Sequence, residues 1–279
     1  MKTIEQEKEN EQGIVTRLTA STFNRRSFFK GVGATGLGLA GAAIIGNQFG
    51  MNEQRVEAAS GVSDGDILNF ALNLEYLEAE FYSVSTYGAT LQQRGILKSN
   101  EVSGPTTGGK MVNFHDLAFL ASAIREDEVD HVLYLRAALG AGAVKKPAIN
   151  LNALGYGFAS VNDWLKLGRQ FEDVGVSAYL GAAPLITSKT YLGAAAAIYG
   201  TEAQHSGSVR YNCISRGVKS PAVDSMDIPP MASTPFFVDK NGLSIPRTTS
   251  QVLNIVYGGG KCSGGFYPDG MNGNIACQS

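Results

Sequence analysis

The sequence has 279 residues and a formal net charge of -2. With 44% hydrophobic and 17% charged residues the chain can bury a substantial core, which excludes a disordered protein and a small disulfide-held scaffold. The near-neutral charge, with no basic cluster interleaved with aromatics after the first sixty residues, argues against nucleic-acid binding. A mean hydropathy of -0.04 argues against a polytopic membrane protein.

Residues 1–59 are predicted to be an export signal and linker that is removed from the mature protein. Arg25 and Arg26 precede an uncharged run, 31–46, which is too short and too rich in glycine for a stable transmembrane helix. This order resembles a twin-arginine translocation signal, with cleavage near residues 58–59. We therefore expect a periplasmic or secreted protein whose partner during export is the twin-arginine translocase.

Four helices are predicted within residues 60–214. Apolar residues recurring at three and four positions place them at 66–87, 114–139, 161–185 and 188–214. The segment 140–160, which joins the second helix to the third, is long enough to cross a bundle. The remaining segment, 215–279, is rich in proline and glycine, so we expect an irregular extension packed on the bundle. The predicted fold class is all-α.

Two histidines share one spacing relative to a glutamate. The second predicted helix contains Glu128-x-x-His131, and the fourth contains Glu202-x-x-His205. Positions three apart lie on one face of a helix, so each pair can place a carboxylate and an imidazole around the same metal ion. Two of the chain's three histidines have this spacing, which chance alone rarely gives. The sequence therefore predicts a metal site.

The first and third predicted helices share a second spacing, between a glutamate and a tyrosine. Glu75 is followed seven residues later by Tyr82, and Glu172 is followed seven residues later by Tyr179. Seven residues are two helical turns, so each tyrosine is expected on the face of its own glutamate. The phenols would either hydrogen-bond a metal ligand and act in redox chemistry, or pack in the core with the hydroxyl held by a buried carboxylate.

Six further acidic residues lie near these positions. Glu78, one turn after Glu75, is either a ligand or a neighbour that supports one. Asp130 and Asp173 adjoin predicted ligands, so they are expected to point away or to hydrogen-bond an imidazole of another helix. The other three are expected to face solvent: Glu80, Glu126 and Asp127.

A glutamate from each of two helices and Glu-x-x-His from each of two others is the pattern of ferritin-like di-iron and di-manganese carboxylate proteins. The chain is identified as a member of this ferritin-like superfamily, and segments 67–82 and 171–179 resemble its secreted branch that includes the desiccation-related proteins. The resemblance implies an antiparallel four-helix bundle with a long crossover between helices two and three. It also implies two Fe or Mn ions held by Glu75, Glu128, His131, Glu172, Glu202 and His205.

Three functions fit this resemblance. The metal centre would oxidise ferrous iron or handle peroxide or O2 in extracytoplasmic stress defence; alternatively, the protein would sequester metal without turnover, or serve as a structural stress-protection protein. The small-residue faces of helices three and four suggest a homodimer, and the proline-rich tail argues against a 24-subunit cage. Among the cysteines, Cys262 and Cys277 could pair after export, leaving Cys213 as a buried thiol.

Overall fold

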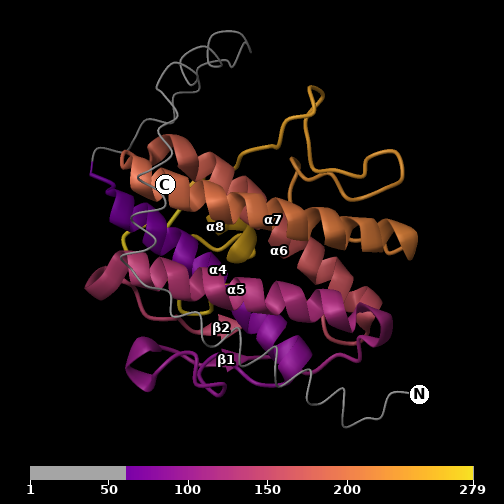
Figure 1. Cartoon of the computed structure of the whole chain (residues 1–279), viewed down its shortest axis with the longest axis horizontal. Coiled ribbons are helices and arrows are strands. Elements are labelled where there is room, and N and C mark those ends of the chain that lie inside the picture. The colour runs from indigo at the N-terminus through magenta and orange to yellow at the C-terminus, as the bar shows by residue number, and fades with distance from the viewer. Residues whose placement is uncertain (1–60, 279) are drawn as a thin grey trace, which may run out of the picture. The chain divides into compact units, whose positions relative to one another are not determined.

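A computed structural model of the chain describes residues 61–278. The predicted export signal, 1–59, lies outside the described residues. Within 61–278 the molecule is mainly helical, with two very short strands (Figure 1). No helix in this range is long and apolar enough to cross a membrane.

Four long helices form the bundle, as the sequence predicts. Helix α4 packs against α5 and α6 packs against α7, while α4 also contacts α6 and so joins the two pairs. The chain reverses between the members of each pair, and the segment between α5 and α6 crosses the length of the bundle (Figure 1). The bounds are α4 Asp64–Tyr87, α5 Ala118–Leu139, α6 Val161–Ala182 and α7 Lys189–Ser215.

Local signals fix the helix ends. Helix α4 begins with a capping box, in which Ser63 accepts from the backbone of Asp66 while the Asp66 carboxylate accepts from Ser63, and it ends at Gly88 with φ 75°. Helix α5 starts later than the predicted residue 114, because His115–Leu117 forms a 3-10 turn first. His115 has φ 48° and its side chain is exposed, so it does not belong to the buried set of predicted ligands.

Helix α4 is buried along most of its length. It is covered by α5 and α6, by the loop 88–112, and by the end of the chain, where the Tyr267 hydroxyl donates to the Asn73 carbonyl. The prediction that Glu80 faces solvent is therefore wrong. Its carboxylate is fully buried, accepts a hydrogen bond from the Leu91 backbone, and lies 3.9 Å from the Lys146 ammonium.

The loop and the crossover are tied together by a short parallel ladder. Strand β1, Thr106–Thr107, pairs with strand β2, Ile149–Asn150. Lys146 lies buried beside this ladder and donates to the Gly104 carbonyl at 2.9 Å. The ladder thus holds the crossover against the outer side of α4.

The C-terminal extension contains a helix that the prediction of irregular structure missed. Helix α8, Thr249–Val256, starts with a capping box between Thr248 and Gln251 and packs against α6. Its eight residues lie in a proline- and glycine-rich segment, and that composition led to the prediction of irregular structure. Beyond it, a disulfide joins Cys262 to Cys277, whereas Cys213 is a free, buried thiol.

Three buried arginines fasten the extension to the bundle. Arg169 on α6 donates to Asp227 at 2.7 Å, and Arg247 of the extension donates to Asp224 at 2.8 Å and to the Ser177 hydroxyl on α6. Arg210 on α7 donates to Asp173 at 2.6 Å and to carbonyls of the extension. The carboxylate of Asp173 therefore points away from the predicted metal site and pairs with arginine instead of imidazole.

Candidate metal centre

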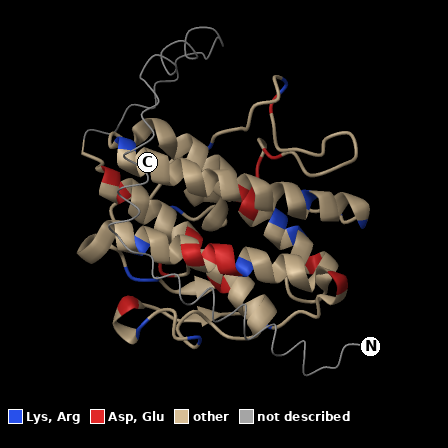
Figure 2. Cartoon of the chain, viewed as in Figure 1, with Lys and Arg blue, Asp and Glu red and all other residues tan. Residues whose placement is uncertain are grey.

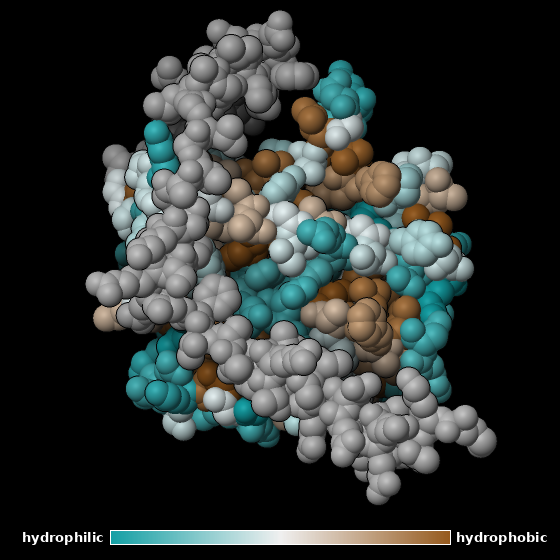
Figure 3. All heavy atoms as spheres, viewed as in Figure 1, coloured by the Kyte–Doolittle hydropathy of each residue, from teal (hydrophilic) through white to brown (hydrophobic). Residues whose placement is uncertain are grey.

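The six predicted ligands come together in the interior of the bundle. Glu75 comes from α4, Glu172 from α6, and the two Glu-His pairs from α5 and α7. Acidic residues gather midway along α5 and α7 (Figure 2), and on the outer face of this region hydrophilic atoms run between hydrophobic patches (Figure 3). All four glutamates are fully buried, and the two imidazoles are only 8% and 6% exposed.

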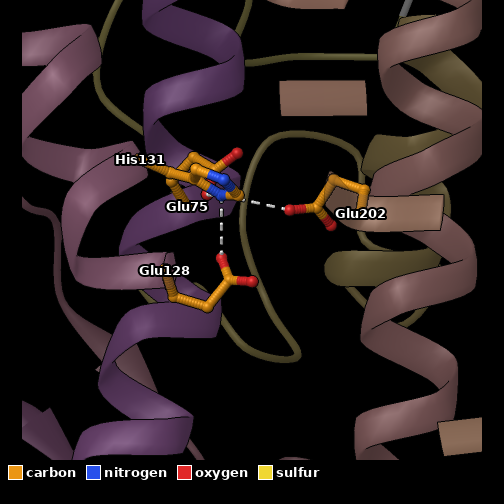
Figure 4. A group of neighbouring side chains, drawn as sticks. All are labelled: Glu75, Glu128, His131 and Glu202. Carbon is orange, nitrogen blue, oxygen red and sulfur yellow. Dashed lines mark hydrogen bonds and ion pairs between the residues drawn. The ribbon is translucent and has the colours of Figure 1, made fainter. Parts of the chain in front are cut away.

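The first group surrounds the Nδ1 atom of His131. This nitrogen lies 3.2 Å from Glu75 Oε2, 3.2 Å from Glu202 Oε1 and 3.5 Å from Glu128 Oε2. Figure 4 shows His131 of α5 directed toward Glu202 of α7 and toward Glu128. A single N–H group can point at only one of the three oxygens, so hydrogen bonding alone does not explain this arrangement.

The second group surrounds the Nδ1 atom of His205. This nitrogen lies 3.0 Å from Glu128 Oε1 and 3.4 Å from Glu172 Oε2. In each group, one atom from each of four side chains lies within 4.8 Å of the others, and both groups contain Glu128 and Glu202. Two carboxylates are therefore shared between two adjoining sets of ligand atoms.

The spacing and the unused oxygens fit bound cations. Two ligand atoms at right angles, each about 2.1 Å from one cation, lie about 3 Å apart, close to the observed N–O separations. Within the cluster, four buried oxygen atoms make no hydrogen bond among the described residues: Glu128 Oε2, Glu172 Oε2 and both oxygens of Glu202. Buried charges normally pair or bind metal, so this Glu/His cluster is suited to holding metal ions.

The glutamates of the cluster bind protons with pKa values far from their ordinary ones. Burial raises the pKa of Glu75 to about 7, although the charge of His131 opposes it. Burial and then the charge of Glu128 raise the pKa of Glu202 well above its ordinary range. Burial also pushes the pKa of Glu128 up, but the neighbouring imidazoles of His131 and His205 outweigh it and hold that pKa well below its usual value. A metal ion entering the cluster must displace protons, so metal and proton binding compete.

Both predicted tyrosines contact the cluster, but each bonds the glutamate of the other helix. Tyr179 of α6 donates to Glu75 Oε1 at 2.5 Å, and Tyr82 of α4 donates to Glu172 Oε1. The i to i+7 spacing predicts the two residues without naming the carboxylate that each one bonds, and the hydroxyls reach across the contact between α4 and α6. Each bond fixes one oxygen of a glutamate and leaves the other directed at an imidazole.

Asp127 takes part in the cluster, which the sequence reasoning did not foresee. Its side chain is 52% exposed, yet its Oδ2 lies 3.1 Å from His205 Nε2. A carboxylate on the second ring nitrogen fixes the orientation of an imidazole whose first nitrogen faces the cluster. The sequence predicts that Asp127 faces solvent, which its exposed side chain bears out, but no local spacing indicates its contact with His205. Glu126 and Asp130 are exposed, as predicted.

Glu78 lies beside the cluster without joining either set of ligand atoms. It is 3% exposed, and no hydrogen bond to its carboxylate is found within residues 61–278. A Cβ atom placed on Gly175 would meet Glu202 Oε2 at 2.6 Å and Glu78 Oε1 at 3.2 Å, so the two carboxylates flank this glycine. Burial, followed by the charge of Glu202, raises the pKa of Glu78 well above its usual range.

These observations define a class of protein: a four-helix bundle that surrounds a buried carboxylate and histidine cluster able to hold metal ions. The sequence model of the ferritin-like domain matches residues 63–213, more than half of the chain. The chain therefore belongs to the ferritin-like domain family. A comparison with curated proteins finds no match.

Proposed function

We propose that the chain is an exported protein with a dinuclear iron or manganese centre that oxidises ferrous iron or handles peroxide or O2 in extracytoplasmic stress defence. The observation that carries the proposal is the pair of adjoining ligand sets that share Glu128 and Glu202. A cluster built for one cation would not need a second imidazole with its own glutamate. The paired arginines before an uncharged run support export through the twin-arginine translocase.

The ligands divide by position into two terminal pairs and two shared glutamates. Glu75 and His131 would hold one ion, Glu172 and His205 would hold the other, and Glu128 and Glu202, which belong to both sets, would contribute to both. When bound, the two ions supply redox electrons and open coordination positions for O2 or peroxide. The chain's own groups set the geometry, since Tyr179 and Tyr82 hold one oxygen of each terminal glutamate.

Burial of the cluster supports redox chemistry over simple surface binding. The four glutamates have no exposed surface, so solvent does not compete freely for the ligand atoms. Carboxylates also tolerate a change of metal charge by altering how they share their oxygens between ions. Three oxygens of Glu128 and Glu202 have no hydrogen bond in the described chain that would restrain such movement.

Metal content of the mature protein, purified without added metal, tests the proposal. We expect about two Fe or Mn per chain by elemental analysis, or the same after anaerobic addition of ferrous or manganous ions. The double variant Glu128→Ala, His131→Ala should lose this metal, whereas Gln204→Ala, on an exposed face of α7, should keep it. Metal uptake equal to the parent in the double variant would refute the site.

Turnover separates the redox function from its alternatives. With two metals bound, the protein should consume O2 on adding ferrous iron, or should consume peroxide, and the double variant should do neither. Metal binding without either activity would favour sequestration. No metal after reconstitution would favour a structural stress-protection protein.

A further inference from the structure

A cavity of about 370 Å³ lies between α4, α6 and the C-terminal extension. Its mouth is formed by exposed residues, among them Leu154, Ala222 and Gly259. Its floor is formed by buried residues of α4 and α6, including Glu78 and Gly175. The volume lies within the range of small-molecule sites. The cavity therefore leads from solvent toward the carboxylates beside the metal cluster.

The floor follows the contact between two helices that repeat each other in sequence. A shift of 97 residues takes Glu75 to Glu172 and Tyr82 to Tyr179, and it also takes Glu78 to Gly175. The glycine thus stands where the repeat would place a second glutamate. A Cβ atom at position 175 would displace the Glu202 carboxylate and crowd that of Glu78, so the glycine leaves room beside Glu78 at the floor.

The polar groups of the cavity differ in what they already bind. Tyr156 donates to Gln170 Oε1 at 2.9 Å, and Gln170 Nε2 donates to the Pro221 carbonyl at 2.8 Å. Glu78, by contrast, accepts no hydrogen bond from any described residue. Most of the remaining lining is apolar, for example Leu77, Val174 and Phe266. The cavity therefore offers an apolar lining and, at its inner end, one hydrogen-bond acceptor that no described residue uses.

We propose that this cavity binds a small organic molecule with an apolar body and a single hydrogen-bond donor, a phenol, alcohol or amine, whose donor meets the carboxylate of Glu78. The role of this molecule as a substrate rests on the proposed function of the neighbouring metal centre. An anionic ligand does not fit, because the largely apolar lining holds no lysine, arginine or histidine to pair with its charge. A peptide or nucleic acid does not fit a cavity of this size.

The first test measures binding of 4-propylphenol to the mature protein by calorimetry, with 4-propylbenzoate and propylbenzene as matched probes. We expect 4-propylphenol to bind about tenfold more tightly than propylbenzene, and 4-propylbenzoate not to bind. In Glu78→Leu the preference for the phenol over propylbenzene should disappear. Failure of 4-propylphenol to bind, or equal binding of the benzoate, would overturn the proposal.

A second pair of variants locates the site. Ile255 on α8 is partly buried, lines the cavity and lies outside the metal cluster, so Ile255→Phe should fill the cavity and weaken binding of 4-propylphenol at least tenfold. Leu243→Phe introduces the same side chain at an exposed position of the extension that does not line the cavity, and should leave binding unchanged. Equal binding by both variants would place the ligand elsewhere and refute the assignment.

Failure of the cavity proposal can be distinguished from failure of the proposed metal function. Binding is measured with and without added metal, and metal content is measured on the same samples. Normal metal content without 4-propylphenol binding would refute only the cavity assignment. Binding of 4-propylphenol that is lost in Ile255→Phe, in protein that takes up no metal, would support the cavity as a binding site and refute the metal function.

Discussion

Glu202 should make the protein less stable when no metal is bound. Both of its carboxylate oxygens are buried, and although Oε1 lies 3.2 Å from His131 Nδ1, neither oxygen accepts a well-directed hydrogen bond within the described chain. An unsatisfied buried polar group costs about 1–3 kcal/mol. Methionine is similar in length and has no charge, so Glu202→Met should stabilise the metal-free protein by about 2 kcal/mol. For a domain of this size that corresponds to a rise in Tm of about 4–8 °C.

Metal binding should reverse the order of the two proteins. Thermal unfolding of the mature parent and of Glu202→Met would be followed by circular dichroism, first after chelation and then with ferrous or manganous ions under anaerobic conditions. The parent Tm should rise on adding metal, because a ligand that binds only the folded state stabilises it. The Tm of the variant should change little, since Glu202 belongs to both sets of ligand atoms.

Gln204→Met provides the matched control, since Gln204 is exposed on the same helix two positions along. This variant should keep both the Tm of the metal-free parent and its response to metal. A metal-free Glu202→Met protein less stable than the parent would show that the carboxylate is satisfied in solution. A normal increase in Tm with metal would show that Glu202 is not a shared ligand.

Three further predictions test the cluster and the extension. Because the pKa of Glu75 is raised to about 7, the metal-free folded state holds a proton that the unfolded state releases above about pH 4.5. The free energy of unfolding in urea should therefore be highest below about pH 4.5 and should fall by about 3 kcal/mol as the pH rises through 7. An increase of this free energy over the same range would contradict the assignment. Tyr82→Phe leaves Glu172 Oε1 without its donor, so chelator competition should show one of the two metals bound more weakly and the other unchanged; equal weakening of both would argue against separate terminal ligands. Replacing Cys262 and Cys277 by serine opens a loop of sequence separation 15 and should lower the free energy of unfolding in urea by about 3 kcal/mol. The variant Cys213→Ser keeps the disulfide, so it shows how much of a loss comes from replacing a cysteine by serine alone.

The sequence predicts the bundle and the convergence of the cluster because both depend on helical periodicity. Positions three apart on one helix and seven apart on another lie on a common face, whatever the surrounding loops do. The four long helices therefore appear within a few residues of the predicted bounds, and the six side chains meet as expected. Long helices with repeated spacing carry this information locally.

Periodicity does not say what covers a helix face, and this explains one wrong prediction and one contact that was not predicted. Glu80 was assigned to solvent, yet the loop 88–112 and Lys146 cover that side of α4. Asp127 lies at the edge of the bundle, where its bond to His205 depends on how far α7 approaches α5. Contacts between segments distant in the sequence decided both cases, and no local pattern contains them.

The departures from the internal repeat show where the two halves of the molecule differ. The cluster itself is nearly symmetric, because Glu75 and Tyr82 on α4 have counterparts in Glu172 and Tyr179 on α6 and the hydroxyl bonds cross between the helices. Holding two similar ions would require only these matched groups together with the Glu-His pairs of α5 and α7. The glutamate and glycine at positions 78 and 175 break the match, and the extension leaves a cavity at that place. A feature that breaks the symmetry of the cluster and opens toward solvent is expected to serve access to the cluster, because metal coordination alone does not require it.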